Sequence, residues 1–351
     1  MARPLRFVPV LRTMQKRWGC ALLALLLVAA TAACGGDDDD DATGSKGSGK
    51  SGDPITLGYS AWPGWFVWAV ADEEGIFDDV GVNVDLKYFA DYLTSLEAMS
   101  TGKIDANSQT LNDTLVSVSA GSDQVIVVTN DNSAGNDAII VDKSITSIED
   151  LKGKKVAAEQ GTVDHYLLLL ALKQAGLTEK DVQFTPMLTD AAAAAFVAGK
   201  VDAVGVFAPF TTTALGLKGS KAIATSKDFP GAIPDHLVFG SGFVEAHPAE
   251  VQAVVQTWFD TLAWIGQNPD QATATMAKRG GVSPADYKSY DAGTTIFTRQ
   301  QNLDAFASGS TPAQLDYQAR QIGDFLVSTG LAEEKPSLDG LLEPKFVQAA
   351  K

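Results

Sequence analysis

Carboxylate, amide and aromatic side chains gather where this chain is expected to leave a strand or to enter a helix. Seven such windows contain no lysine and no arginine. They cover residues 59–71, 89–102, 107–117, 129–137, 159–172, 205–217 and 229–236. The candidate binding residues that we select from them are Trp62, Trp65, Asp91, Tyr92, Asn112, Asp113, Asp137, Asp164, His165 and Phe207.

Carboxylates and ring faces together favour a small solute that is cationic or a neutral amide. A cation gains charge-assisted hydrogen bonds from carboxylates and about 0.5–2 kcal/mol from each aromatic ring face that it meets. An anion would need basic side chains or helix N-terminal amides, because unpaired carboxylates nearby would repel it. Arg279, Arg299 and Arg320 could fold into the same region, and the prediction depends on their absence from it.

Each candidate also has a purely structural interpretation. Aromatic residues at helical spacing usually belong to a core, which applies to Trp62 and Trp65. Asp137 could be a structural residue near a hinge. Helix capping or a helix start would account for Asp91, Asp113, Asp164 and His165.

The composition excludes several classes of function. The chain has 351 residues, 45% of them hydrophobic, and a net charge of −16 from 43 acidic and 27 basic residues. This apolar content suffices for a folded core, and the acidity disfavours nucleic acid and anionic lipid surfaces as partners. The only cysteines are Cys20 and Cys34, which excludes a disulfide framework and a zinc site built from several thiolates. We expect no metal and no cofactor.

Signs of catalysis are scarce. The chain contains no GxSxG and no HExxH motif and has only three histidines. A carboxylate pair such as Asp113 and Asp164 is the remaining candidate for acid–base chemistry. We therefore predict that the protein is not an enzyme.

The first 33 residues predict an export signal. A basic stretch from Arg3 to Arg17 precedes the short apolar run from Cys20 to Cys34. The end of this run, Thr31-Ala-Ala-Cys34, resembles a bacterial lipobox, although Thr31 replaces the usual leucine. The resemblance implies a lipid on Cys34, and ordinary secretory cleavage is the alternative. Residues 34–53 hold a run of five aspartates, Asp37 to Asp41, and a Gly/Ser/Lys stretch, which predicts a disordered tether between the lipid and a folded part outside the cytoplasm.

Two segments of the chain carry the same order of expected elements. The first has strands at 55–59 and 82–89 and from 103, with helices at 65–74 and 91–101. The second has strands at 155–158 and 182–186 and from 200, with helices at 163–175 and 190–198. The residues 102–106 and 199–203 match almost letter for letter. Each βαβαβ segment predicts a mainly parallel sheet, and ligands bind beyond the carboxyl ends of such strands.

The predicted fold is therefore α/β, with two lobes that face each other across a cleft and a helical C-terminal tail. A strand at 235–240 is expected to return to the first lobe, and the chain beyond Pro248 is expected to be mainly helical. The expected parts are a signal peptide (1–33), a tether (34–53), lobe 1 (54–142 and 239–351) and lobe 2 (143–238).

These features resemble the type II periplasmic binding proteins of ABC importers. The motifs that narrow the resemblance to the nitrate/taurine/aliphatic-sulfonate group are Gly75-Ile-Phe77, Gly102-Lys-Ile-Asp105, the run from Ser147 to Val156 and Gly199-Lys-Val-Asp202. The resemblance implies capture of a small ligand between lobes, closure by hinge bending, and delivery to a permease and its ATPase. We expect a monomer, because docking to a permease needs the outer tip of each lobe free.

Other stretches resemble a branch of that group thought to carry urea or guanidinium. They are Trp62-Pro-Gly-Trp65, Asp91-Tyr92 with Ser95, Gly135-Asn-Asp137 and His165-Tyr-Leu-Leu168. We predict a lipoprotein that binds a small nitrogen-containing solute of the urea, guanidinium or amine type. The alternatives are a binding protein for a small anion such as taurine, an alkanesulfonate or nitrate, a sensor module without a transporter, and an enzyme.

Overall fold

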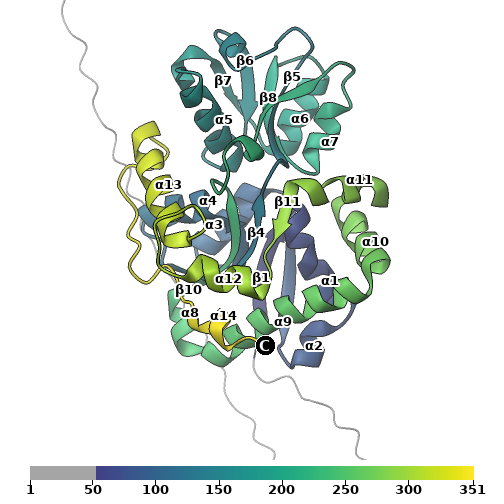
Figure 1. Cartoon of the computed structure of the whole chain (residues 1–351), viewed down its shortest axis with the longest axis vertical. Coiled ribbons are helices and arrows are strands. Elements are labelled where there is room, and N and C mark those ends of the chain that lie inside the picture. The colour runs from purple at the N-terminus through teal and green to yellow at the C-terminus, as the bar shows by residue number, and fades with distance from the viewer. Residues whose placement is uncertain (1–52) are drawn as a thin grey trace, which may run out of the picture. The chain divides into compact units, whose positions relative to one another are not determined.

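The computed structural model describes residues 53–351 (Figure 1). The predicted signal peptide, Cys34 and almost all of the predicted tether lie outside the described residues. Within the described part of the chain, no helix is both long and apolar enough to span a bilayer.

The first sheet has six strands in the order β11-β4-β10-β3-β1-β2. The strand bounds are Ile55–Ser60 (β1), Val84–Phe89 (β2), Ala106–Thr110 (β3), Gln124–Ser133 (β4), Pro234–Gly240 (β10) and Thr294–Ile296 (β11). β1 pairs in parallel with β2 and β3, as the βαβαβ pattern predicts, whereas β10 runs antiparallel to both β3 and β4.

The second sheet has five strands in the order β7-β6-β8-β5-β9. The strand bounds are Asp137–Val141 (β5), Lys155–Ala158 (β6), Gln183–Pro186 (β7), Ala203–Phe207 (β8) and Lys221–Thr225 (β9). β6 pairs in parallel with β7 and β8, and β5 runs antiparallel to β8 and β9. Both sheets are therefore mixed, each with a parallel set of three strands next to a reversed strand.

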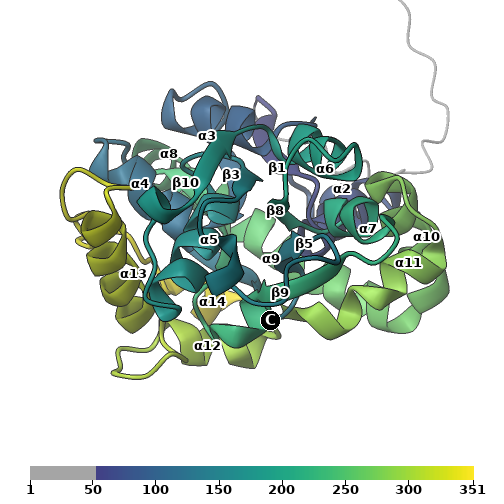
Figure 2. The same cartoon turned by 90° about the horizontal axis from the view of Figure 1, so that it is seen from above.

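Helices flank both sheets. In the first βαβαβ segment they are the 3₁₀ helix η1 (Pro63–Phe66), α1 (Val67–Glu73), α2 (Ile76–Val80), α3 (Tyr92–Ser100) and α4 (Leu111–Ser119). In the second they are η2 (Glu149–Leu151), α5 (Val163–Gln174), η3 (Glu179–Asp181), α6 (Thr189–Val197), α7 (Phe210–Leu215) and η4 (Ser226–Asp228). Figure 2 shows α5, α6 and α7 around the strands of the second sheet.

The helical C-terminal tail is confirmed. It comprises α8 (Ser241–Ala246), α9 (Pro248–Gln267), α10 (Pro269–Gly280), α11 (Pro284–Ser289), η5 (Asp291–Gly293), α12 (Arg299–Phe306), α13 (Leu315–Thr329) and α14 (Lys345–Ala349). Val251, Val254 and Val255 of α9 are fully buried, and the ring of Trp258 packs against Trp68 of α1 at 4.8 Å between centroids. The apolar spacing in this helix therefore faces the core of the first sheet.

The chain crosses between the sheets at positions that differ from our predicted lobe boundaries. β5 belongs to the second sheet, whereas the boundary at residue 142 counted it with lobe 1. The whole of β10 belongs to the first sheet, whereas the boundary at residue 238 divided it. The difference arises because each crossing strand pairs with the sheet that it enters. The division into lobes itself remains a prediction.

The two crossings lie against each other. The first is residues 134–136, between β4 and β5, and the second is residues 229–233, between η4 and β10. The hydroxyl groups of Ser133 and Ser226 are 2.7 Å apart, and the backbone N–H of Gly135 donates to the Ser226 hydroxyl, also at 2.7 Å. These contacts hold the two connections together at one place.

Candidate functional site

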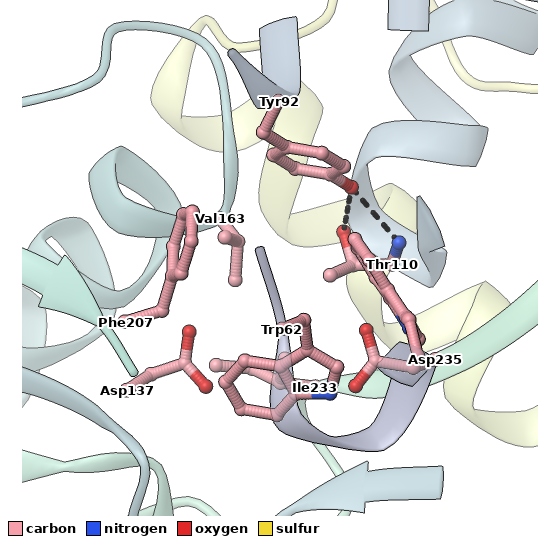
Figure 3. Close-up of a pocket in the computed structure, with 9 residues that line it drawn as sticks. Trp62, Tyr92, Thr110, Asp137, Val163, Phe207, Ile233 and Asp235 are labelled. Atoms are coloured by element: carbon pink, nitrogen blue, oxygen red, sulfur yellow. Dashed lines mark hydrogen bonds between the residues drawn. The ribbon is translucent and has the colours of Figure 1, made fainter. Parts of the chain in front are cut away.

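A small pocket lies where the two sheets meet (Figure 3). Its lining residues are Trp62, Trp65, Tyr92, Thr110, Asp137, Val163, Phe207, Ile233 and Asp235. The volume that the centre of a water-sized sphere can occupy is only about 10 Å³, which is room for about one water molecule. The lining side chains therefore almost fill the pocket in this structure.

The reversed strands bring two carboxylates to this pocket. Asp137 is the first residue of β5 and pairs with Phe207, the last residue of β8. Asp235, near the start of β10, pairs with Thr110, the last residue of β3. Because a reversed strand starts where its parallel neighbours end, both aspartates lie at the carboxyl edges, where ligands bind in open α/β sheets.

Four aromatic rings form most of the remaining wall. Trp62 and Trp65 flank the Pro63-Gly64 turn after β1, and their ring centroids are 6.4 Å apart. Tyr92, the first residue of α3, lies 5.3 Å from Trp65. Phe207 comes from the other sheet and makes edge contacts with Trp62 at 6.4 Å and with Tyr92 at 6.1 Å. The aromatic wall is thus shared between the two halves of the protein.

The turn that presents the tryptophans is fixed by a third carboxylate. The indole Nε1 of Trp62 donates to Oδ1 of the fully buried Asp131 at 2.9 Å. A Cβ atom on Gly64 would lie 2.0 Å from Oδ2 of Asp131. Only glycine therefore fits at position 64 while Asp131 keeps its place.

The carboxylates of the pocket have no basic counterpart. Oδ2 of Asp137, Oδ2 of Asp131 and both carboxyl oxygens of Asp235 have no hydrogen-bond partner among residues 53–351. Burial raises the pKa of Asp131 and that of Asp137 to about 7. Burial, and after it the charge of Asp131, raises the pKa of Asp235 well above its usual value. Burial therefore shifts these three carboxyl groups toward their protonated, neutral forms.

The three tail arginines do not line the pocket. Arg279 lies over the rings of Tyr88 and Tyr59, at 4.9 and 5.8 Å from their centroids. Arg299 donates to the backbone carbonyl of Gln348, and Arg320 pairs with Asp316 on its own helix. Our prediction of a cationic or neutral ligand required these three arginines to lie outside the binding region, and none of them is among the lining residues.

Five of the ten candidate residues line the pocket and five do not. Those in the lining are Trp62, Trp65, Tyr92, Asp137 and Phe207. Asp113 is buried next to the pocket, where its carboxylate accepts hydrogen bonds from the Thr110 hydroxyl and from Asn112 Nδ2, each at 2.7 Å. Asp113 and Asn112 thus support Thr110, which is itself part of the lining.

The remaining candidates have structural partners elsewhere. Oδ2 of Asp164 accepts from the Thr189 hydroxyl at 2.6 Å. Nε2 of His165 lies 2.7 Å from Oε2 of Glu179, and its ring stacks on Phe184 at 4.4 Å. Val163 lines the pocket, and two residues turn a helix by about 200°, so His165 faces away from it. Asp91 is half-buried at the start of α3.

Thr110, Val163, Ile233 and Asp235 line the pocket but are not among our candidates. Thr110, Asp131 and Asp235 all fall inside the windows that lack basic residues. The reversal of β10 would have singled out Asp235, because its register places Asp235 beside the end of β3. Val163 and Ile233 are apolar and carry no sequence signal for binding.

Comparison with known proteins places the chain in a family. Residues 63–272 match the model of the NMT1/THI5-like family. The chain belongs to this family. The prediction that it resembles the binding proteins of the nitrate/taurine/sulfonate group is confirmed.

Two curated proteins are similar in sequence to this member of the NMT1/THI5-like family. An Escherichia coli protein, provisionally described as an aliphatic sulfonates-binding protein, is 31% identical over 65% of this chain and 72% of its own length. A Brucella abortus protein, provisionally described as a binding protein, is 26% identical over 83% of this chain and 89% of its own length.

Solved structures agree on the fold. The alkanesulfonate-binding protein SsuA of Xanthomonas axonopodis has a TM-score of 0.70 at 20% identity, over 83% of this chain and 98% of its own. The desulfurization enzyme DSZB shares the fold with a TM-score of 0.59 at 19% identity, over 84% of this chain and 98% of its own. The type II periplasmic-binding-protein fold is thus confirmed for this member of the family.

Proposed function

We propose that this protein is the solute-capturing component of an ABC importer and that it holds a small nitrogen-containing cation between its two sheets. One observation supports this ligand class. Asp137 and Asp235 line the same pocket as four aromatic rings, and no lysine or arginine among residues 53–351 lines it. The unpartnered carboxyl oxygens need N–H donors, and the ring faces attract positive charge.

A flat cation with N–H groups on several edges meets both requirements. Guanidinium is the simplest example, because its planar fork binds carboxylates and its face stacks on aromatic rings. Urea has a similar shape without the charge, so it would lose the charge-assisted part of each hydrogen bond. We expect guanidinium to bind at least about tenfold more tightly than urea, since charged hydrogen bonds exceed neutral ones by roughly 1 kcal/mol or more each.

The proposed role in transport is supported by the family and by the predicted export signal. In this role a ligand draws the two sheets together, and a permease with its ATPase accepts the solute. A lipid on Cys34 would hold the protein at the outer face of the membrane, and a monomer would leave the tips of both lobes free for docking.

A small anion is the second candidate, and the comparisons favour it over a cation. The Escherichia coli relative and the solved structure of SsuA are both described as sulfonate-binding proteins. The pocket offers one chemical route to an anion: the carboxyl groups of Asp131 and Asp137, whose pKa is about 7, can donate hydrogen bonds while they are protonated. Anion binding by this route would weaken as the pH rises.

Calorimetric titration of the exported protein distinguishes the two ligand classes. The panel is guanidinium, urea, taurine and nitrate, each at pH 7.5 and at pH 6. Our proposal expects guanidinium to bind most tightly and to gain affinity at the higher pH. Tight taurine or nitrate binding with guanidinium inert would instead establish the anion function.

We also propose that the protein has no catalytic activity, although one solved structure with this fold is an enzyme. Both curated relatives are provisionally described as binding proteins. Among residues 53–351, no cluster of histidine, cysteine, aspartate or glutamate is suited to hold a metal. Residues 44–51 fit the sequence pattern of a phosphate-binding loop, G-x-x-x-x-G-K-S. This pattern binds nucleotides when it follows an apolar strand, and here it follows a run of five aspartates. We therefore assign no nucleotide site to it.

A further inference from the structure

Asp131 and Asp235 are direct cross-strand partners in the antiparallel pair of β4 and β10. Side chains at such positions have Cβ atoms about 4.5–5.5 Å apart. A register shift follows immediately, between Asp235 and His236, and irregularities of this kind commonly direct a side chain toward a site. Asp235 lines the pocket, and Asp131 lies behind it and holds the indole of Trp62.

Among residues 53–351, no basic group is among those whose charge shifts the pKa of Asp131 or Asp235. The titratable groups that act on the pair are Asp137 from β5, Asp113 from α4 and Tyr287 from α11. Burial lowers the pKa of the neighbouring His236 to about 3, so this ring is neutral at physiological pH. Among the described residues outside the pair, Trp62 is the single hydrogen-bond donor to it, and the carboxyl groups of Asp131 and Asp235 lie within hydrogen-bond reach of each other.

Two buried carboxylates without a counter-charge cannot both stay ionised. In the empty protein the pair must therefore hold a proton, which one carboxyl group donates to the other. A cation that reaches Asp235 supplies the missing positive charge, and the proton then becomes dispensable.

We propose that Asp131 and Asp235 form a proton-sharing pair that exchanges its proton for the cationic ligand. This inference rests on the proposed cation-binding function of the same pocket. In the exchange, the ligand forms hydrogen bonds to Asp235, the O–H bond of the pair breaks, and the proton passes to a base of the solvent buffer. Asp235 contacts the ligand, whereas Asp131 is a positioning residue that acts through Asp235 and Trp62.

The pair of Asp131 and Asp235 makes the pocket more selective for cations over anions and neutral solutes than Asp137 alone would make it. An anion cannot replace the proton, because it would add a third negative group to the pair. A neutral solute of the same shape can bind only while the proton stays. The pair therefore favours positively charged solutes, increasingly so as the pH rises.

The test is isothermal titration calorimetry with guanidinium chloride at pH 6.5, in buffers that differ in their heat of ionisation. The dependence of the observed heat on the buffer counts the protons released per ligand bound. In the wild-type protein we expect a net release that Asp131→Asn lowers by about one proton. The side-chain amide of that variant can still accept from Trp62 and donate to Asp235, so it mimics the protonated pair and preserves the structure.

Two further variants separate the pair from its surroundings. Asp137→Asn removes the other carboxylate of the pocket and should leave the proton of the pair exchangeable, although it weakens binding. Asp270→Asn changes a carboxylate whose side chain is 96% exposed and should change neither the affinity nor the proton count. Equal proton release by wild type and Asp131→Asn would overturn the inference.

Carbon-13 NMR of the aspartate carboxyl groups measures the protonation of Asp131 and Asp235 as a function of pH, without any ligand. Spectra of Asp131→Asn and Asp235→Asn assign the two signals, and we expect the pair to titrate in two separate steps, the upper of them well above the normal aspartate range. If both groups titrate normally while guanidinium binds, the proton-sharing pair is wrong and the cation function stands. If the pair titrates as expected but guanidinium fails to bind, the cation function is wrong and the exchange is overturned with it.

Discussion

Asp137 and Asp235 occupy corresponding places in the two sheets, each near the start of the strand that runs against its parallel neighbours. Each has the last residue of a parallel strand as its partner, Phe207 for Asp137 and Thr110 for Asp235. In the proposed function, a ligand between them would meet one carboxylate from each half of the protein. The same two side chains would then take part both in binding and in the approach of the two halves.

Removing either of these charges should weaken cation binding without unfolding the protein. Asp137→Asn and Asp235→Asn keep the side-chain shape and delete one charge-assisted hydrogen bond, which contributes roughly 1.5–3 kcal/mol. We expect the dissociation constant for guanidinium to rise about 10- to 100-fold, as measured by calorimetry. Asp270→Asn serves as the matched control, and a loss of affinity in that variant would point to a nonspecific charge effect.

The ring of Phe207 should matter for binding more than for folding of either sheet. Phe207→Leu removes the aromatic face that the second sheet contributes, so we expect about a 3- to 30-fold loss of guanidinium affinity. Phe243→Leu is the control, since that ring stacks on Phe239 of β10 outside the pocket. It should lower the melting temperature and leave the affinity as it is; unchanged affinity in Phe207→Leu would remove this ring from the site.

A methyl group at position 64 should disable the pocket. In Gly64→Ala the new Cβ would meet the Asp131 carboxylate at 2.0 Å, so either the turn or Asp131 must move and the Trp62 hydrogen bond must change. We expect binding to fall sharply, with altered tryptophan fluorescence. Gly242→Ala, in α8, has open space around the added Cβ and should raise the stability by about 0.5–1 kcal/mol while it leaves binding intact.

The stability of the empty protein should decrease as the pH rises from 6.5 to 8. Burial raises the pKa of Asp113, Asp131 and Asp137 to about 7 and that of Glu159 to about 8, so the folded state binds more protons than the unfolded chain in this interval. Stability falls with pH wherever that is true. His236 acts in the opposite direction only below pH 6.5, because its pKa is lowered in the folded protein.

Chemical denaturation at pH 6.5, 7.25 and 8 measures this dependence directly. Guanidinium salts cannot serve as the denaturant, because they supply the proposed ligand. Urea is used instead, and its own weak binding to the protein is measured separately. Asp235→Asn should flatten the dependence. A stability that rises over this interval would show that these carboxyl groups are already ionised in the folded protein.

The lipid on Cys34 remains a prediction, and one substitution tests it. Cys34→Ser removes the thiol that would carry the lipid, so the exported protein should appear in the extracellular or periplasmic fluid and not in the membrane fraction. Cys20→Ser, within the same apolar run, is the matched control and should leave the protein membrane-bound. If both variants partition alike, Cys34 does not anchor the protein.

The elements that repeat along the chain could be predicted because each has its own local signal. The expected strand at 155–158 and the start of the helix at Val163 match the structure residue for residue. The strand expected at 235–240 in the first half is confirmed as β10, but its antiparallel direction and the place of β5 in the second sheet were not predicted, because such pairing depends on how distant segments meet. That pairing selects Asp235 for the pocket, while the direction of a helix face excludes His165 from it.

The serine contact between the two connecting segments has a consequence for how solute leaves the protein. The Ser226 side chain contacts Ser133 and Gly135, so the two connecting segments between the sheets are held together at one place. Such a double tether permits swivelling about one axis and opposes separation or sliding. Under the proposed capture function, solute would enter and leave through a change in the angle between the halves, and a rigid covalent link on the side opposite Ser226 would trap a bound solute.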